Sequence, residues 1–165
     1  MFTVEQLRVF PLENWIPVQR AVLCFIFEGD RVLLIEKKRG LGAGKVNGPG
    51  GKIDPGESAL QAAQRETQEE IGITPLHPQS SGELFFQFTD GLSIHCEVFR
   101  SDAYEGHLVE TDEALGFWCA LQEIPYERMW QDDIYWFDHL IHRRYFRGYF
   151  TFDADLMLSQ RIELL

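Results

Sequence analysis

The sequence predicts an α+β fold, an α/β/α sandwich in which a mixed β-sheet carries helices on both faces. Two observations support this prediction. β-prone runs separated by turn residues occur on both sides of one acidic helical segment, and a second helical segment follows late in the chain. With 165 residues, 45% hydrophobic and 13% aromatic, the chain has the length and composition of one compact domain with a sizeable core.

The first half of the chain is expected to begin with a β-hairpin. Residues 18–27 and 31–37 are β-prone and flank a short turn at residues 28–30. A glycine-rich loop follows over residues 39–49, and a helix is predicted from residue 58 to residue 71. This order places the loop directly ahead of the acidic helix.

The second half of the chain is expected to contain four strands and one helix. The strands are predicted at residues 84–88, 92–100, 116–120 and 145–152, and the helix at residues 132–143. The first two of these strands are joined by a Thr-Asp-Gly turn, and the last is expected to be the final strand. We find no repeat, linker or low-complexity segment between these elements.

The first predicted helix carries three glutamates, Glu66, Glu69 and Glu70. Because an α-helix turns by about 100° per residue, these side chains are expected to lie in one stripe of its surface. Like charges so close raise one another's pKa unless a cation neutralises them, and carboxylate oxygens favour Mg²⁺ or Mn²⁺. The alternative is a solvated acidic face, the commoner meaning of such glutamates in isolation.

The residues around these glutamates favour a metal site. Gly51, Glu57, Arg65 and Gly72 occupy fixed positions in the run GGKIDPGESALQAAQRETQEEIGI, and so complete a pattern is rare by chance. A Gly-Gly pair lets the backbone approach a phosphate or expose a carbonyl to a metal. Arg65 is expected to pair with Glu57 and lock the preceding loop against the helix.

This run resembles the Nudix box, with Thr67 where that family usually carries an aliphatic residue. The resemblance implies the Nudix fold and a diphosphate-cleaving hydrolase with Mg²⁺ as its cofactor and Mn²⁺ as a substitute. The implied metal ligands are the Gly50 carbonyl and the side chains of Glu66, Glu69, Glu70 and Glu113. The implied catalytic residues are Glu57, Arg65, Glu69 and Glu70. The general base stays open among the three helix glutamates, with Glu70 preferred because it must lie both near the metal and on the stripe.

A wider resemblance covers residues 22–152. The segments KKRGLGAGKVNGPGGK, GELFFQF, VETDEALGFW, IPYERMWQDDIYWF and RGYFTF are similar to those of the MutT-like oxidised purine nucleoside triphosphatases. This similarity implies hydrolysis of 8-oxo-dGTP and 2-hydroxy-dATP to the monophosphate and pyrophosphate, which sanitises the nucleotide pool. It also divides the chain into an N-terminal extension, residues 1–16, packed on a single domain over residues 17–165. The alternatives are hydrolysis of another nucleoside diphosphate derivative, such as ADP-ribose or a dinucleoside polyphosphate, or a nucleotide-binding sensor without turnover.

Trp130, Asp132 and Asp133 are the candidates for binding the purine base. A large aromatic face can stack on a purine, and adjacent carboxyl groups can meet its polar edge. If one carboxyl is protonated and the other ionised, the pair offers both a donor and an acceptor. The alternative for the three residues is a helix N-cap with a hydrophobic staple. Asn47 can pair with a base edge through its amide, or can be a left-handed turn residue in the glycine-rich loop.

The remaining substrate candidates are Lys37, Gly51, Lys52 and Phe86. The resemblance places Lys37 near the base or sugar and Lys52 near the phosphates, whereas Lys38 and Arg39 are interpreted as a solvated strand end. Phe86 is expected on a strand lining the nucleotide pocket, although strand aromatics are more often core residues. The histidines have no common ligand spacing, and no metal role is assigned to them.

Charge and hydropathy limit the partners. A net charge of −11 argues against binding a nucleic-acid polymer, which requires a basic surface, but is compatible with a small nucleotide that arrives with metal. No apolar run reaches the length of a membrane span, and the first residues lack the features of a signal peptide, so a cytoplasmic protein is expected. A monomer is expected because the chain is short and has no obvious apolar stripe left over. Cys24, Cys96 and Cys119 are expected to be reduced core thiols.

Overall fold

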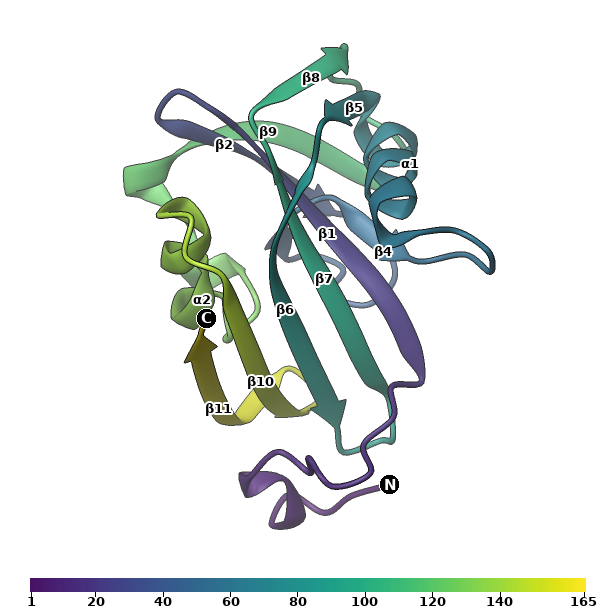
Figure 1. Ribbon diagram of the computed structural model, residues 1–165, viewed down its shortest axis with the longest axis vertical. Helices are drawn as coiled ribbons and strands as arrows, with labels where there is room; N and C mark the ends of the chain where they lie inside the picture. The colour runs from purple at the N-terminus through teal and green to yellow at the C-terminus, as the bar shows by residue number, and fades with distance from the viewer.

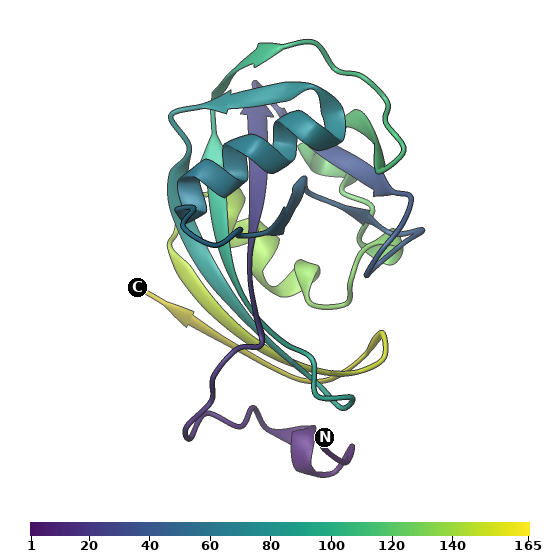
Figure 2. The same ribbon diagram turned by 90° about the vertical axis from the view of Figure 1, so that its right-hand side faces the viewer.

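The computed structural model describes residues 1–165 and contains one large mixed β-sheet with a helix on each face (Figures 1 and 2). The sheet runs in the order β11-β10-β6-β7-β1-β2-β3, with β4 paired to β1 and β9 paired to β2. Its strands are β1 (Gln19–Glu28), β2 (Arg31–Lys37), β3 (Val46–Asn47), β4 (Gly50–Lys52), β6 (Gln79–Phe88), β7 (Ser93–Ser101), β9 (Ala114–Ala120), β10 (Phe146–Asp153) and β11 (Leu156–Leu164). The strand pairs β1·β7 and β10·β6 are parallel and the others antiparallel, which confirms the predicted mixed sheet.

The helices are α1 (Ala59–Ile71) and α2 (Asp133–Ile141), and they cover opposite faces of β1. Val22 and Cys24 pack with alanines of α1, whereas Phe25 packs against Trp136 and Phe137 of α2. Because successive strand side chains point to opposite faces, this alternation gives β1 two buried faces. The predicted sandwich is therefore confirmed, with β1 at its centre.

The ends of α1 follow local sequence signals. Ser58 Oγ accepts from the Gln61 backbone N–H at 3.1 Å, and the Gln61 side chain accepts from the Ser58 backbone N–H at 2.9 Å, a capping box. The helix ends at Gly72, whose φ of 78° favours glycine. Thr67 is fully buried and bonds the Ala63 carbonyl at 2.8 Å, so this departure from the family pattern lies in the core.

Several short or irregular strands were not predicted. β5 (Ile73–Leu76) and β8 (Ala103–Gly106) form a separate two-stranded sheet, and β3 and β4 lie within the glycine-rich region. Segments of two to four residues are too short to establish a period of two in the sequence. The prediction that residues 145–152 form the final strand is wrong, because β11 follows after a turn at Ala154, where φ is 53°. β11 is an edge strand whose apolar pattern is interrupted by polar residues.

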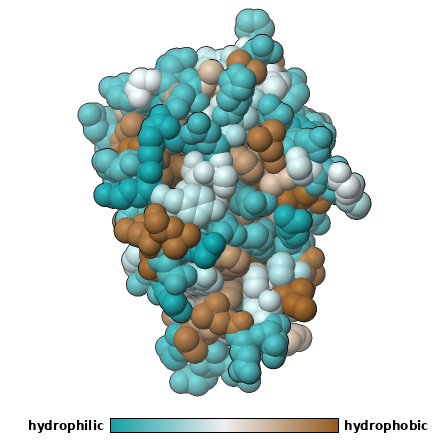
Figure 3. Space-filling view, viewed as in Figure 1, coloured by the Kyte–Doolittle hydropathy of each residue, from teal (hydrophilic) through white to brown (hydrophobic).

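Small helical turns and the N-terminal residues complete the fold. 3₁₀ helices occur at Gln6–Arg8, Leu121–Glu123 and Tyr126–Arg128. The N-terminal residues cross the lower end of the large sheet in Figure 2, and apolar surface is visible at the same end in Figure 3. None of the helices has the length and hydropathy needed to span a bilayer. The three cysteines are buried and free, as predicted.

Candidate active site

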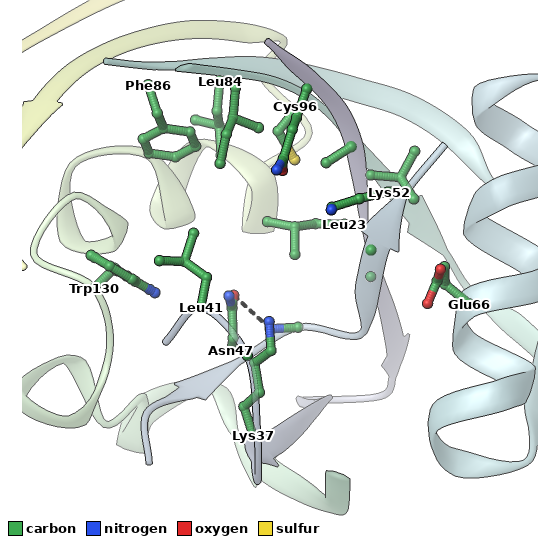
Figure 4. Close-up of a pocket in the computed structure, with 18 of the residues that line it drawn as sticks. Leu23, Lys37, Leu41, Asn47, Lys52, Glu66, Leu84, Phe86, Cys96 and Trp130 are labelled. Atoms are coloured by element: carbon green, nitrogen blue, oxygen red, sulfur yellow. Dashed lines mark hydrogen bonds between the residues drawn. The ribbon is translucent and has the colours of Figure 1, made fainter. Parts of the chain in front are cut away.

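A cavity of about 560 Å³ lies between α1, α2 and the inner face of the large sheet (Figure 4). Its lining combines residues from the two predicted groups, the acidic helix and the base-binding candidates. Of the predicted site residues, the lining includes Lys37, Asn47, Gly50, Gly51, Lys52, Glu66, Glu70, Phe86, Glu113, Trp130, Asp132 and Asp133. Residues that are far apart in the sequence are thus brought to one cavity.

Glu70 is the most buried carboxylate at the α1 end, with 3% of its surface exposed. Its Oε1 accepts from the Gly50 backbone N–H at 2.8 Å. Burial raises the pKa of Glu70 to about 7; the Gly50 bond opposes the rise and the charge of Glu66 adds to it. A carboxyl group held in this way gains most from a nearby cation.

Glu66 lies beside the backbone of β4. A Cβ atom at Gly51 would lie 2.4 Å from Glu66 Cδ, so only glycine allows this carboxylate to lie against the strand. Burial raises the pKa of Glu66, while Arg65 lowers it and the charges of Glu69 and Glu113 raise it. The neighbouring carboxylates therefore disfavour the ionised form of Glu66 unless a cation offsets their charge.

Arg65 and Glu57 form the predicted pair. Arg65 Nε donates to Glu57 Oε2 at 2.7 Å and Nη2 to Oε1 at 2.9 Å, and Nη2 also donates to the Lys52 carbonyl at 3.1 Å. The Arg65 bonds, with the Asp54 backbone N–H, lower the pKa of Glu57 to about 2. The bidentate contact fixes the loop before α1 to the helix, and the Lys52 bond ties the same arginine to β4.

Glu69 lies outside the cavity lining. Its side chain is 52% exposed and its Oε2 is 3.2 Å from Arg65 Nη1 one helical turn earlier. The helix therefore brings Glu66 and Glu70 to the cavity and leaves Glu69 at its rim. Glu69 remains a proposed ligand that no contact in this structure supports.

The acidic end suits a hard divalent cation in its chemistry, although no three acidic, histidine or cysteine side chains converge as a preformed metal cage. Glu66, Glu70 and Glu113 all supply oxygen atoms to the same cavity. Glu113 Oε1 accepts from Arg39 Nη2 at 3.2 Å, and Glu66 Oε1 accepts from Arg65 Nη1 at 3.0 Å. Each of these arginine bonds uses one oxygen, so the second oxygen of each carboxylate is left to accept an ion.

Asp132 and Asp133 lie at the opposite end of the cavity and are 1% and 3% exposed. Asp132 Oδ2 accepts from Trp136 Nε1 at 2.8 Å, whereas Asp132 Oδ1 and Asp133 Oδ2 have no partner. Burial raises the pKa of Asp132 to about 6, and burial with the charge of Asp132 raises the pKa of Asp133 well above its usual value. Buried polar atoms without partners that line a cavity favour a polar ligand.

The helix-cap alternative for these aspartates is wrong. Asp132 is the residue before α2, but it has helical φ and ψ and its side chain makes no cap hydrogen bond. Its one side-chain bond goes to Trp136 instead. The carboxyl pair is therefore free of a capping role.

Trp130 forms the aromatic wall of the cavity (Figure 4). Its ring packs edge-on against Phe88 and Phe152, with centroids 6.0 Å and 5.3 Å away. The glycine-rich loop reaches its other side, where a Cβ atom at Gly42 would lie 2.7 Å from Trp130 Nε1 and Lys45 Nζ lies 5.2 Å from the ring centroid. The indole is thus held between the sheet and the loop.

Asn47 lies in β3 with a negative φ, so the left-handed turn alternative is wrong. Its Oδ1 accepts from the Gly48 N–H at 2.8 Å, which leaves the amide N–H₂ available to a ligand. Lys37, Lys52 and Phe86 also line the cavity (Figure 4). Each of these substrate candidates thus faces the same space.

The interpretation of Lys38 and Arg39 as a merely solvated strand end is wrong, because both exposed side chains make polar contacts. Lys38 forms an ion pair with Glu110, and Arg39 forms one with Glu113. Lys38 donates to the Thr111 carbonyl at 2.8 Å and lies outside the cavity lining. Arg39 lines the cavity beside Glu113, so its interpretation as merely solvated is wrong.

Phe88 and Ile94, expected with Phe86 on strands that line the nucleotide pocket, are in the cavity lining. The sequence reasoning missed several other apolar lining residues: Leu23, Leu41, Leu84, Cys96 and Trp136. The alternation of side chains along a strand could have identified some of these residues. Leu84, Phe86 and Phe88 alternate along β6, so choosing Phe86 as a wall residue implied its neighbours two positions away. No local signal identified Leu41 or Trp136.

The comparisons with known proteins agree with this geometry. A family model described as the NUDIX domain matches residues 17–140. A Danio rerio protein named oxidized purine nucleoside triphosphate hydrolase is 41% identical over 145 residues, which cover 86% of this chain and 92% of that protein. A Mus musculus protein of the same name is 38% identical over 141 residues, covering 83% and 89%.

A solved structure titled as the MutT protein of Bacillus halodurans is also similar. It superposes with a TM-score of 0.80 at 31% identity and covers 88% of this chain and 98% of that one. Nudix hydrolases generally act with divalent metal ions, in agreement with the oxygen-rich α1 end. The family match, the relatives and the fold together establish that this chain belongs to the Nudix hydrolase family.

Proposed function

We propose that this Nudix hydrolase cleaves oxidised purine nucleoside triphosphates, 8-oxo-dGTP and 2-hydroxy-dATP, to the monophosphate and pyrophosphate, with Mg²⁺ as its metal. The names of the Danio rerio and Mus musculus relatives support the substrate class. The observation that carries the proposal is the buried Asp132–Asp133 pair, whose unpartnered oxygens line the same cavity as Glu66 and Glu70. One nucleotide can therefore meet both ends.

The α1 end is proposed to bind the metal and the phosphates. Glu66, Glu70 and Glu113, with the Gly50 carbonyl and Glu69, would hold Mg²⁺, and Mn²⁺ would fit the same oxygen donors. When bound, the ion neutralises the phosphate charge and lowers the pKa of the attacking water. Glu70 is the preferred general base because it is buried at the cavity, and Arg65 and Glu57 act as a positioning pair for the loop before α1. Lys52 offsets phosphate charge, and Gly51 lets the backbone approach it.

The α2 end is proposed to bind the base. A protonated Asp133 beside an ionised Asp132 offers one donor and one acceptor, and the raised pKa of Asp133 supports this division. Stacking on Trp130 and Phe86 and a contact with the Asn47 amide complete the base site, and Lys37 lies near the sugar or the base. This arrangement serves oxidised guanine and hydroxylated adenine because each presents both a donor and an acceptor.

The test is a comparison of kcat/KM for 8-oxo-dGTP, 2-hydroxy-dATP, dGTP, dATP and ADP-ribose, with products identified by chromatography. We expect pyrophosphate and monophosphate from the oxidised purines, and no turnover after metal chelation. Because specificity is the ratio of kcat/KM values, an oxidised substrate should exceed its normal counterpart by at least about tenfold. If ADP-ribose or a normal nucleotide is the best substrate by that margin, the proposal is wrong.

A further inference from the structure

The N-terminal strap, residues 1–18, lies almost entirely outside the region matched by the Nudix family model, which begins at residue 17. It crosses the outer face of the large sheet, the face opposite the cavity (Figure 2). Leu7 is fully buried and Phe10 is 7% exposed, and Phe10 packs edge-on against Tyr149 of β10 with centroids 5.4 Å apart. The Phe2 N–H donates to the Thr89 carbonyl in the β6–β7 turn at 2.9 Å. The strap is therefore anchored at several points along its length.

Beneath the strap lies a row of three polar residues on adjacent strands: Ser93 of β7, Gln87 of β6 and Thr151 of β10. Gln87 is directly paired with Ser93 and with Thr151 in the sheet register. Their exposed fractions are 2%, 3% and 0%, so three polar side chains on an outer sheet face are almost completely excluded from water. This burial requires both a cover and hydrogen-bond partners.

Each member of the row has a partner in the strap. Trp15 Nε1 donates to Gln87 Oε1 at 2.8 Å, and Thr151 Oγ1 donates to the Leu7 carbonyl at 2.5 Å. Ser93 Oγ accepts from the Val18 N–H at 2.9 Å. A lost partner would leave a buried polar atom unsatisfied, which costs about 1–3 kcal/mol. The outer face is thus chemically matched to this strap.

The same strands carry the wall of the cavity on their other face. Phe86 and Phe88 flank Gln87 in sequence and line the cavity, as does Ile94 next to Ser93. Gln87 Nε2 also donates to the carbonyls of Phe88 and Leu92 at 3.0 and 3.3 Å, which ties the end of β6 to the start of β7. Gln87 therefore connects the strap to the hairpin that forms one side of the base end.

We propose that the N-terminal strap positions the base end of the cavity, and that Trp15 is a positioning residue acting through Gln87 on Phe86 and Phe88. This proposal depends on the proposed function only in assuming that the bound base is an oxidised purine. The Trp15 side chain contacts the sheet through its hydrogen bond to Gln87 and the packing of its ring on Phe85. Both partners point to the outer face, and neither lines the cavity. Its effect must therefore pass through the sheet. An alternative role as a simple stabilising cover would lower stability without changing nucleotide binding.

The test uses the full chain with Trp15→Phe, which keeps an aromatic ring but removes the N–H donor. We expect the KM for 8-oxo-dGTP to rise about 3- to 10-fold, the loss of one hydrogen bond, with kcat within about twofold of the starting protein. Ile16→Ala is the matched control, because its side chain is 80% exposed and only its carbonyl meets Ser93. The control should leave KM unchanged.

A double-mutant cycle separates positioning through Gln87 from a general effect of the strap. Gln87→Met should raise KM by itself, and adding Trp15→Phe to it should change KM little, because contacting residues that act through one another are not additive. Amide hydrogen exchange should be faster over residues 86–94 in Trp15→Phe and unchanged in α1. Unchanged KM and exchange in Trp15→Phe, or fully additive KM effects, would overturn the proposal.

Failure of the proposed function would give a different result. In that case the unsubstituted protein would itself prefer a nucleotide other than an oxidised purine. The KM values of the same double-mutant cycle would then be measured with that preferred nucleotide. These values and the hydrogen exchange of Trp15→Phe would decide the role of the strap.

Discussion

The α1 end and the α2 end of the cavity each hold a pair of acidic side chains, but the two pairs differ in their hydrogen-bond partners. At the α1 end, Glu70 accepts from the Gly50 N–H and Glu66 accepts from Arg65. At the α2 end, Asp132 has one indole partner, and one oxygen of each aspartate has none. The first pair has hydrogen-bond partners and is suited to bind a cation. The second pair has buried oxygens without partners and is suited to accept hydrogen bonds from a ligand. We infer that the α1 end determines whether a phosphate chain is cleaved and the α2 end determines which base is accepted.

The largest expected effect on activity comes from removing a carboxylate at the α1 end. Glu70→Gln should lower the rate of pyrophosphate release about 10²- to 10⁴-fold, because it removes a proposed base and metal ligand. The loss should be similar for every nucleotide tested in steady-state assays, since the base lies elsewhere. Glu105→Gln is the control, because Glu105 is an exposed carboxylate on β8 outside the cavity lining, and it should leave the rate unchanged. An active Glu66→Gln, Glu70→Gln double variant would contradict the mechanism.

A smaller and substrate-selective effect is expected from Trp136 at the α2 end. Its indole N–H can only donate, so it favours the ionised form of Asp132, and Trp136→Phe should raise the pKa of that carboxyl above about 6. The kcat/KM for 8-oxo-dGTP should fall about tenfold, as expected for a buried acceptor left unpaired.

The pH profile distinguishes this effect from a general loss of packing. The pH at which kcat/KM for 8-oxo-dGTP changes should move upward in Trp136→Phe. Trp118→Phe serves as the control, because Trp118 lies on β9 with the Arg31 guanidinium 4.3 Å from its ring centroid and outside the cavity lining. An unmoved pH profile in Trp136→Phe would contradict the role assigned to the indole.

The smallest expected effect is a pH-dependent stabilisation by metal at the α1 end. The pKa of Glu70 is raised from 4.5 to about 7, so folding favours its protonated form. The stability that this protonation contributes is fully present below pH 4.5 and is lost as pH rises through about 7. Mg²⁺ stabilises the ionised form, so its addition should raise Tm by a few degrees, roughly the effect of 1 kcal/mol, at pH 8 and by less at pH 5.

Thermal melts with and without Mg²⁺ at the two pH values measure this difference. In Glu70→Gln the dependence of the Mg²⁺ effect on pH should be reduced. An equal Tm increase at both pH values in the starting protein would show that Glu70 is not linked to the metal.

The two ends also differ in how far the sequence could predict them. The α1 end is encoded within residues 50–73, where helical spacing and glycine positions bring Glu57, Arg65, Glu66 and Glu70 together. Helical spacing alone could not exclude Glu69 from the cavity, because Arg65 one turn away attracts it. Where a helix side chain lies depends on which neighbouring residues it contacts, as the bond from Arg65 to Glu69 shows.

At the α2 end, the resemblance identified Trp130, Asp132 and Asp133, whereas the residue types alone favoured a helix cap. Only tertiary packing shows that Trp136 holds Asp132 and that the aspartates are buried. The N-terminal strap was predicted to pack on the domain, yet its three partners lie on strands more than sixty residues away, which no local pattern encodes. Sequence patterns identified most of the longer strands, and long-range contacts determined what covers them.

The most direct measurement of the central claim is a competition between equimolar 8-oxo-dGTP and dGTP in one reaction, with both monophosphates quantified over time. The division between a cleaving end and a selecting end predicts that the unsubstituted protein consumes 8-oxo-dGTP at least about tenfold faster. In Asp132→Asn this preference should fall toward unity, with dGTP turnover little changed. Equal losses on both nucleotides in Asp132→Asn, or a preference for dGTP in the unsubstituted protein, would contradict the account.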